Sequence, residues 1–251
     1  INCTPIGMYP HNPASLIDIT QFSKLEGVVD LIYNPRRTIL LLQAEMMEIP
    51  HCDGLPFLVA QGVEAANHFQ GESFGTKEIE QILRDMRREK ENIILIGMPG
   101  VGKTTVGKAL GEEMGRTCVD VDQELEKEIG DISTYITEQG EPAFRKKEAE
   151  TIAKLGTETG LVISTGGGCV TVPKNYAHLR QNGRIYQLTQ PVENLSTSGR
   201  VLSSGGIEHL RELEATRTPM YESFAQCIVE HNRNAPETVA AILEDFEANL
   251  L

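Results

Sequence analysis

The sequence predicts an α/β fold for residues 91–251, with a parallel sheet covered by helices on both faces. Four short apolar runs alternate there with stretches of helical periodicity, at 93–96, 117–119, 161–164 and 184–187. Such runs are typical of buried parallel strands, and their alternation with helices is typical of a sheet covered on both sides. In addition, the first run leads directly into a glycine-rich segment and then into a helical pattern.

Residues 1–70 predict a smaller α/β segment. The run VVDLIY at 28–33 is typical of a strand, Thr38–Met47 has helical periodicity, and 62–69 has the pattern of the end of another helix. This segment precedes the larger predicted sheet and does not continue its pattern.

A linker and a charged helix are expected at 71–90. GESFGTK at 71–77 has the composition of a linker, and the charged stretch after it places Ile79, Ile82 and Met86 on one helical face. We therefore expect three parts, with boundaries at 1–70, 71–90 and 91–251.

The segment NIILIGMPGVGKTT at 92–105 carries the pattern Gly97-x-x-x-x-Gly102-Lys103-Thr104. A strand before it and a helix over Val106–Met114 would place the glycines in a strand-to-helix turn, where backbone N–H groups bind anions. The pattern in this context predicts a phosphate-binding loop, the P-loop of nucleotide-binding proteins. The simpler alternative is a glycine-rich turn that only connects two elements.

The residue types in this loop indicate a nucleotide with a divalent cation. Lys103 can reach the β- and γ-phosphates, and the Thr104 hydroxyl can complete the coordination of a Mg²⁺ that bridges them. The residues expected to bind ATP are Gly97, Gly100, Val101, Gly102, Lys103, Thr104 and Thr105.

The charge balance argues against nucleic acid and anionic membranes as partners. Asp and Glu number 36 against 23 Lys and Arg, which gives a formal net charge of -13 in 251 residues. An anionic substrate must therefore be held by local arginines.

Cysteine usage and hydropathy indicate a reducing cytoplasm. The five cysteines are scattered and show no C-x-x-C spacing, which argues against a disulfide framework or a zinc site. No apolar run approaches the length of a membrane span, and no signal-peptide pattern follows Ile1. The start at Ile1 in the middle of a motif suggests a chain cut from a longer one.

Two acidic residues follow the second apolar run, in CVDVD at 118–122. Strand alternation would place Asp120 and Asp122 on one side of a strand end, where ligands of parallel sheets bind. One carboxylate can serve the Mg²⁺ shell and the other can accept a hydroxyl proton, as phosphoryl transfer requires. The alternative is a pair of solvated acids.

Two further segments add candidate substrate contacts. GEPAFRKKE at 140–148 places Arg145 and Glu148 three apart on a helix, where they can pair, although a surface ion pair would have the same spacing. ISTGGG at 163–168 ends a predicted strand in three glycines. Glycines there let a ligand approach the backbone closely, and a plain flexible turn is the alternative.

Taken together, residues 92–250 resemble shikimate kinase. The resemblance rests on an ordered set of motifs: GMPGVGKT at 97–104, DVD at 120–122, GEPAFRKKE at 140–148, STGGG at 164–168 and RTPMY at 217–221. It implies a P-loop fold like that of nucleoside monophosphate kinases, a monomeric kinase domain, and ATP- and Mg²⁺-dependent phosphorylation of the 3-hydroxyl of shikimate.

The resemblance also implies roles for individual residues. Asp122 would bind the substrate hydroxyls and accept the proton, and Asp120 would be the outer-shell Mg²⁺ residue. Arg145 and Arg217 would grip the substrate carboxylate, because a guanidinium fork suits a planar carboxylate. Glu148 would orient Arg145. Backbone groups offered to a ring hydroxyl are implied at Gly167 and Gly168.

A lid and a base-binding loop complete the resemblance. Residues 195–206 have the small, polar, glycine-rich composition of a segment that closes over a ligand. Arg200 matches the lid arginine that neutralises the transferring phosphoryl group, although Val201 stands where a proline is usual. Pro236 matches the loop that contacts adenine.

Residues 1–70 resemble the last third of shikimate dehydrogenase, through NCTPIGM at 2–8, VDLIYNP at 29–35 and GLPFLVAQ at 54–61. The resemblance implies that Tyr33 and Gln61 contact substrate. It also implies that a nicotinamide would lie against Thr4, Met8 and Gly54, with Phe57 in place of the usual methionine.

The catalytic Lys and Asp of the dehydrogenase and its dinucleotide loop would lie upstream of this segment. We therefore expect an incomplete Rossmann-type remnant that does not catalyse hydride transfer, and NADP binding only where the full dehydrogenase domain is present. On this interpretation the chain is the C-terminal part of a fusion of the two enzymes.

Two alternatives remain open at this point. One is another small-molecule P-loop kinase of the gluconate or nucleoside monophosphate type, which a substrate panel would distinguish. The other is a non-catalytic nucleotide-binding module, which would bind ATP without forming a phosphorylated product.

Overall fold

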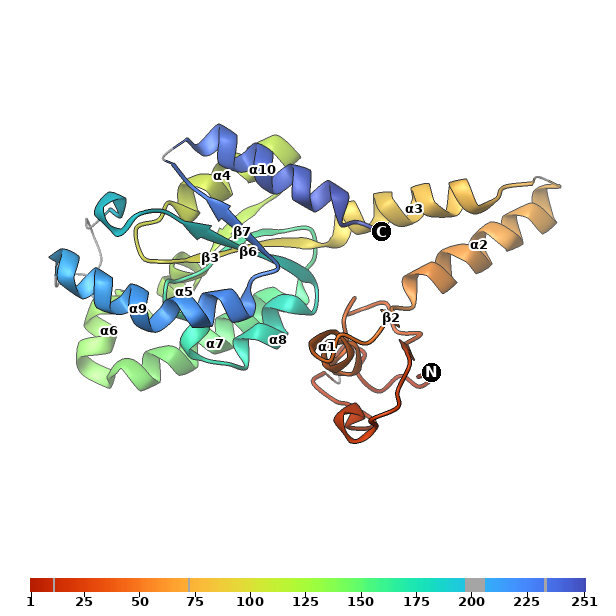
Figure 1. Cartoon of the computed structure of the whole chain (residues 1–251), viewed down its shortest axis with the longest axis horizontal. Helices are drawn as coiled ribbons and strands as arrows, with labels where there is room; N and C mark the ends of the chain where they lie inside the picture. Colours follow the sequence, from red (N-terminus) through yellow and green to blue (C-terminus); the bar gives the residue numbers. More distant parts are fainter. Residues whose placement is uncertain (11, 72, 197–205, 233) are drawn as a thin grey trace. The chain divides into compact units, whose positions relative to one another are not determined.

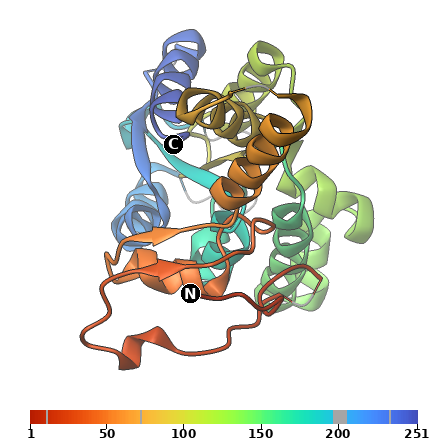
Figure 2. The same ribbon diagram turned by 90° about the vertical axis from the view of Figure 1, so that its right-hand side faces the viewer.

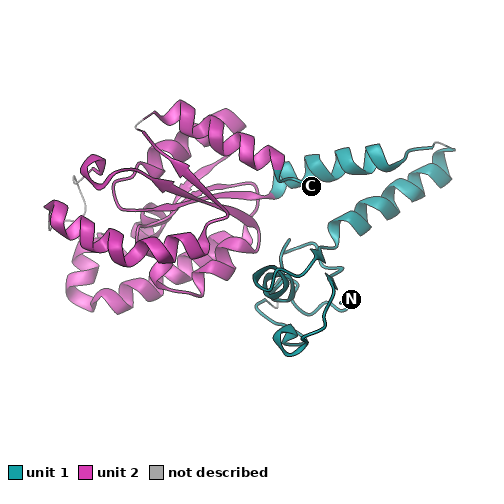
Figure 3. Cartoon of the chain, in the orientation of Figure 1, with its two compact units in different colours: residues 1–90, 249–251 teal, residues 91–248 magenta. Residues whose placement is uncertain are grey.

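The computed structural model describes residues 1–251 except 11, 72, 197–205 and 233. The chain forms two compact units, one of Ile1–Lys90 with Asn249–Leu251 and one of Glu91–Ala248 (Figure 3). We call them the N-terminal unit and the larger unit. The segment 71–90 thus belongs to the N-terminal unit, while the domain boundaries of the sequence analysis remain a prediction.

The described part of the larger unit contains a five-stranded parallel sheet in the order β4-β5-β3-β6-β7 (Figure 1). Its strands are β3 Asn92–Gly97, β4 Cys118–Asp120, β5 Val162–Ser164, β6 Gly183–Thr189 and β7 Cys227–Glu230. The first four coincide with the four apolar runs, so the prediction of a parallel α/β sheet is confirmed. The sequence analysis missed β7.

Helices cover both faces of this sheet. In Figure 1, α4 and α10 lie on one face, whereas α7, α8 and α9 lie on the other. The helices of this unit are α4 Lys103–Met114, α5 Val121–Ile129, α6 Ile132–Gln139, α7 Glu141–Thr157, α8 Asn175–Arg180, α9 Gly206–Phe224 and α10 Ala235–Ala248, with 3₁₀ turns at Cys169–Thr171 and Val192–Asn194. The arrangement is the three-layer fold that the sequence predicts.

The central strand explains why this sheet could be found from sequence. The side chains of β3 from Ile93 to Ile96 have no exposed surface, because neighbouring strands and two helical layers enclose them. The edge strand β7 differs: Ile228 is 54% exposed and only a three-residue apolar run marks the strand. An edge strand needs fewer apolar residues, and its signal is correspondingly weak.

The parallel arrangement brings three chemically important segments to one edge. In the sheet register Leu95 lies opposite Ser164, and Ser164 lies opposite Asp120. The glycine-rich loop at 97–104, which we call the nucleotide loop, follows β3, the glycine segment 166–168 follows β5, and α5 follows β4. All three therefore start from the carboxyl edge, where ligands of parallel sheets bind.

The N-terminal unit, red to orange in Figure 2, contains a two-stranded parallel sheet of β1 Val28–Val29 and β2 His51–Cys52. Its helices are α1 Ile39–Met46, α2 Leu55–Gln70 and α3 Thr76–Lys90, with a 3₁₀ turn at Ile19–Gln21. The strand predicted at 28–33 is shorter in the structure. The buried carboxylate of Asp30 accepts from Ile32 N at 3.0 Å and Thr38 Oγ1 at 2.7 Å, which turns the chain away from the sheet direction.

Helices α2 and α3 pack together through a small apolar cluster. Leu83 is buried there against Val59 and Val63, and Ile79 and Met86 are partly buried. The predicted apolar face of α3 was wrong in one position, because Ile82 is 39% exposed and Leu83 takes its place. Leu83 lies four residues after Ile79 and three before Met86, which is the spacing of one helical face.

No helix in the described ranges is both long and apolar enough to cross a membrane.

Candidate active site

The nucleotide loop between β3 and α4 requires glycine at its first positions. Gly97 and Gly100 have φ values of 141° and 83°, which residues with a side chain rarely adopt. A methyl group on Gly97 would lie 2.4 Å from Leu188 O, and one on Gly100 would lie 2.2 Å from Ser196 O. The loop therefore rests closely on the end of β6 and on Ser196 after it.

Lys103 is held against the start of this loop. Its side chain is almost completely buried, and Nζ donates to Gly97 O at 2.8 Å and to Met98 O at 3.0 Å. These two carbonyls fix the ammonium at the carboxyl end of β3, where phosphate binding at the helix N-terminus would need a positive charge.

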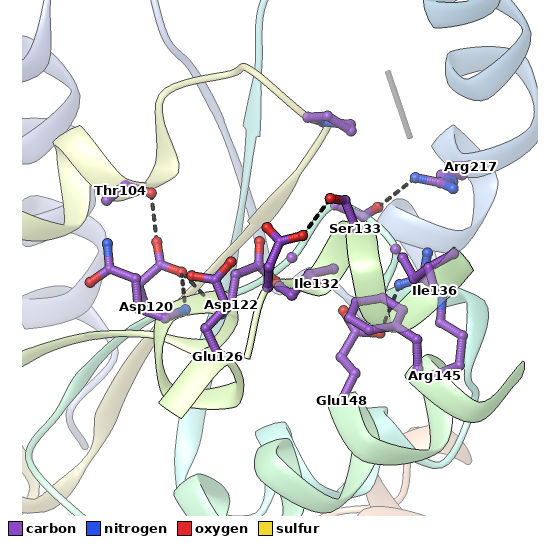
Figure 4. Close-up of a pocket in the computed structure, with 17 residues that line it drawn as sticks. Thr104, Asp120, Asp122, Glu126, Ile132, Ser133, Ile136, Arg145, Glu148 and Arg217 are labelled. Atoms are coloured by element: carbon purple, nitrogen blue, oxygen red, sulfur yellow. Dashed lines mark hydrogen bonds and ion pairs between the residues drawn. The ribbon is translucent and has the colours of Figure 1, made fainter. Parts of the chain in front are cut away.

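Thr104 and Asp120 form the part of the site that suits a divalent cation. Thr104 Oγ1 donates to Asp120 Oδ2 at 2.7 Å (Figure 4). The other oxygen, Asp120 Oδ1, accepts from Asp122 N at 3.1 Å and Gln123 N at 3.4 Å, which caps α5. Hydroxyl and carboxylate oxygens are ligands that Mg²⁺ accepts, so these residues fit the expected ion.

The described residues offer no cluster of three or more His, Cys, Asp or Glu side chains that could hold a metal. A cation at Thr104 and Asp120 would therefore depend on phosphate oxygens and water for most of its coordination. This is the usual way in which Mg²⁺ binds in nucleotide sites.

Asp122 lies in the first turn of α5, and not on a strand as the alternation predicted. The chain turns into a helix immediately after Asp120, because that carboxylate caps the helix. The carboxylate of Asp122 nevertheless faces the same cavity as Asp120. At a helix N-terminus the helix dipole also stabilises its negative charge.

A cavity of about 500 Å³ opens at this edge of the sheet (Figure 4). Carboxylates, two arginines and glycine backbone dominate its lining: Asp120, Asp122, Glu126, Asp131, Glu148, Arg145, Arg217, Gly166, Gly167 and Gly168. Thr104 and Pro99 of the nucleotide loop also line it. One cavity thus joins the nucleotide loop to the predicted substrate residues.

Arg145 on α7 is oriented by two carboxylates. Its Nη1 donates to Glu148 Oε2 at 2.8 Å and its Nη2 donates to Glu141 Oε1 at 3.0 Å. Burial raises the pKa of Glu148, while the charge of Arg145 opposes that rise. Glu148 has no exposed surface, and its Oε1 has no hydrogen-bond partner among the residues that the structure describes.

The glycine segment 166–168 provides contact surfaces for both arginines. A methyl group on Gly168 would lie 2.3 Å from Arg145 Nη1, so only glycine lets the guanidinium lie on the backbone there. Arg217 on α9 donates from Nη1 to Gly167 O at 3.1 Å, and the hydroxyl of Tyr221 donates to the same oxygen. The structure thus brings Arg145 and Arg217 to adjacent residues of one loop.

Some predicted residues have a less defined place. Arg200 lies outside the described residues. Pro236 is the second residue of α10 and Thr105 lies in the first turn of α4, both exposed. Val101 is buried. Their roles remain predictions.

Sequence reasoning missed several residues of the site. Glu126 on α5, with Asp131 and Ser133 at the start of α6, lines the cavity. Tyr221 belongs to the quoted motif RTPMY but received no role. His231, directly after β7, lies against the nucleotide loop. The RTPMY motif was the available signal for Tyr221, because residues four apart on a helix share a face with Arg217.

Comparison with known proteins agrees with this geometry. A family model described as shikimate kinase matches residues 99–247, which is more than half of the chain. The chain belongs to the shikimate kinase family. It is therefore a phosphotransferase, as the sequence predicts.

Individual shikimate kinases are also similar to this chain. The enzyme of Nitrosomonas europaea is 38% identical in an alignment of 152 residues that covers 57% of this chain and 72% of that protein. The enzyme of Thiobacillus denitrificans is 37% identical over 163 residues, 62% of this chain and 89% of that protein.

Solved structures of the family show the same fold. Shikimate kinase from Acinetobacter baumannii in complex with shikimate superposes with a TM-score of 0.59 at 31% identity, over 66% of this chain and 98% of that one. Shikimate kinase from Aquifex aeolicus gives a TM-score of 0.57 at 30% identity, over 64% and 98%. The family match begins at Pro99, so the dehydrogenase resemblance of residues 1–70 remains a prediction.

Proposed function

We propose that the larger unit, Glu91–Ala248, transfers the γ-phosphoryl group of ATP to the 3-hydroxyl of shikimate. The observation that carries this proposal is that Arg145, Arg217 and Asp122 share one cavity with Thr104 and Asp120. A carboxylate-binding pair and a phosphate-binding loop in one cavity suit a small acidic alcohol and a nucleotide.

Two arginines bind the substrate carboxylate in this proposal. Each guanidinium is already oriented, Arg145 by Glu148 and Glu141 and Arg217 by the Gly167 carbonyl. A planar carboxylate can accept paired hydrogen bonds from such groups, which a lysine could not match in geometry. Backbone groups of Gly167 and Gly168 would face the substrate ring.

In this proposal Lys103, Thr104 and Asp120 bind the phosphate groups of ATP and their Mg²⁺. Mg²⁺ held by Thr104 and, through water, by Asp120 would neutralise charge on the β- and γ-phosphates. Lys103 adds a positive charge at the same place, and Arg200 does so from the lid by the family resemblance. Stabilising this charge and aligning the reactants account for most of phosphoryl-transfer catalysis.

Asp122 accepts the proton. As the substrate hydroxyl oxygen bonds to the γ-phosphorus, the bond from that phosphorus to the bridging oxygen of ADP breaks, and the hydroxyl proton passes to the Asp122 carboxylate. The products are shikimate 3-phosphate and ADP.

The test is ADP release by the full chain, measured with ATP and Mg²⁺ in the presence of shikimate, gluconate or nucleoside monophosphates. We expect release that depends on shikimate, and a product whose ³¹P spectrum places the phosphate on the 3-oxygen. Release with gluconate alone would favour the other kinase class. ATP binding without any phosphorylated product would favour a non-catalytic module.

For the N-terminal unit we propose a non-catalytic remnant of shikimate dehydrogenase, supported by the three motifs at 2–8, 29–35 and 54–61. A methyl group on Gly54 would lie 2.0 Å from Leu31 O, which explains the glycine that opens the third motif. We expect no NADPH formation from NADP⁺ and shikimate. Formation of NADPH that depends on shikimate would contradict the remnant.

A further inference from the structure

His231 lies directly against the nucleotide loop at Gly102. A methyl group built on Gly102 would be 2.9 Å from His231 Nε2 and 3.0 Å from its Cδ2. The edge of the ring thus occupies the space that a side chain at this loop position would need. His231 is 6% exposed, so the ring is part of the packed support of the loop.

The backbone of His231 is fixed by the sheet. Its N–H donates to Thr189 O at 2.7 Å, directly after Glu230 pairs with Thr189 in the β6–β7 ladder. The ring therefore starts from a rigid position, and its contact with Gly102 does not depend on a loose loop.

The other ring nitrogen is tied to helix α10. His231 Nδ1 lies 2.7 Å from Thr238 Oγ1, and Thr238 Oγ1 donates to Asn234 O at 3.0 Å. A hydroxyl has one hydrogen, so Thr238 accepts from His231 Nδ1–H. In the neutral ring, Nε2 then carries a lone pair toward Gly102. Burial lowers the pKa of His231, which favours this neutral form.

We propose that His231 is a positioning residue for ATP, which sets the spacing between Gly102 of the nucleotide loop and the first turn of α10. This inference rests on the proposed function. The two segments would hold two ends of one nucleotide, since the loop binds phosphates and the turn carries Pro236, which the resemblance places at adenine. A rigid ring between them prepares both contacts before ATP arrives, and such preorganisation strengthens binding.

Three variants separate the two ends of the ring. His231→Ala removes both contacts. His231→Asn places an amide where Nδ1 stands and can keep the bond to Thr238, whereas His231→Gln reaches the place of Nε2 beside Gly102. Binding of ADP is measured by calorimetry without shikimate, and the KM for ATP and for shikimate is measured by ADP release.

We expect His231→Ala to weaken ADP binding and raise the KM for ATP about tenfold, a change of about 1.4 kcal/mol. The KM for shikimate should stay near that of the parent. We expect His231→Gln and His231→Asn each to restore only part of the nucleotide affinity, because each keeps one of the two contacts. A control is His178→Gln on α8, another histidine whose pKa burial lowers, which should bind ADP like the parent.

The inference is overturned if the folded His231→Ala variant binds ADP as the parent does, or if its KM for shikimate rises as much as that for ATP. It is also overturned if either His231→Gln or His231→Asn binds ADP as tightly as the parent, because each variant keeps only one of the two contacts. That comparison remains decisive if the Ala variant does not fold. Failure of the proposed function would be distinct, because the parent would then bind ADP without shikimate-dependent turnover.

Discussion

The guanidinium of Arg145 lies on the backbone of Gly168, so close that a methyl group there would be 2.3 Å from Nη1. The same guanidinium donates to the fully buried carboxylate of Glu148. Gly168 and the Glu148 carboxylate therefore fix the position of the Arg145 guanidinium. The proposed binding of the substrate carboxylate depends on that position.

Gly168→Ala should weaken shikimate binding and leave nucleotide binding intact. The new methyl group would displace the Arg145 guanidinium, and loss of one charge-assisted hydrogen bond costs about 1.5–3 kcal/mol, which is roughly 10- to 150-fold in KM. The KM values for shikimate and ATP measure the effect. Gly62→Ala is a matched control, because that methyl group would meet no atom within 4 Å. Equal rises in both KM values would contradict the assignment.

Glu148→Gln should also raise the KM for shikimate, by about tenfold, because a neutral amide orients Arg145 less firmly. Binding of ADP, measured separately, should not change. The KM for shikimate should thus rise while nucleotide binding stays the same. A variant with unaltered KM for shikimate would show that Glu148 does not orient Arg145 for binding.

Asp122→Asn should keep ADP binding and lose turnover. An amide cannot accept the hydroxyl proton, and such proton transfer contributes about 10²- to 10⁴-fold to rate. The kcat for ADP release measures this loss, and ADP affinity by calorimetry is the internal reference. Glu128→Gln, at an exposed position of α5, serves as the control. Turnover close to that of the parent would refute the proton-acceptor role.

Asp245→Asn should reduce stability at neutral pH and have less effect in acid. Burial by itself would raise the pKa of Asp245, but the bonds from Arg184, one at 2.7 Å, lower it below its usual value. The stabilisation is therefore present above the unfolded pKa near 3.8 and is lost as pH falls through the lower folded value. We expect about 1 kcal/mol at pH 7, the order of a partly exposed pair.

Thermal unfolding of parent and Asp245→Asn across pH 3–7 checks this expectation. The two stability curves should converge toward the acid end. Curves that stay parallel over the whole range would show that the Arg184 contact does not depend on the charge of Asp245.

Sequence reasoning predicted some elements correctly and others wrongly, and each error has a physical reason. It correctly placed Asp120 at the end of a strand but put Asp122 there too, because alternation cannot show that Asp120 caps a helix. It missed β7, since an edge strand with Ile228 half exposed has a short apolar run. In α3 it chose Ile82 over Leu83, because burial there is decided by packing against α2.

Local pattern was enough to predict the strand, the glycine-rich turn and the helix around Lys103, because these segments are adjacent in the chain and follow from backbone geometry. Local pattern could not show which distant residues meet in the folded protein. The placing of Arg145 and Arg217 on adjacent glycines, and of His231 under Gly102, required the folded chain. Those contacts join residues 23 to 129 positions apart, and only the order of strands in the sheet brings such distant segments together.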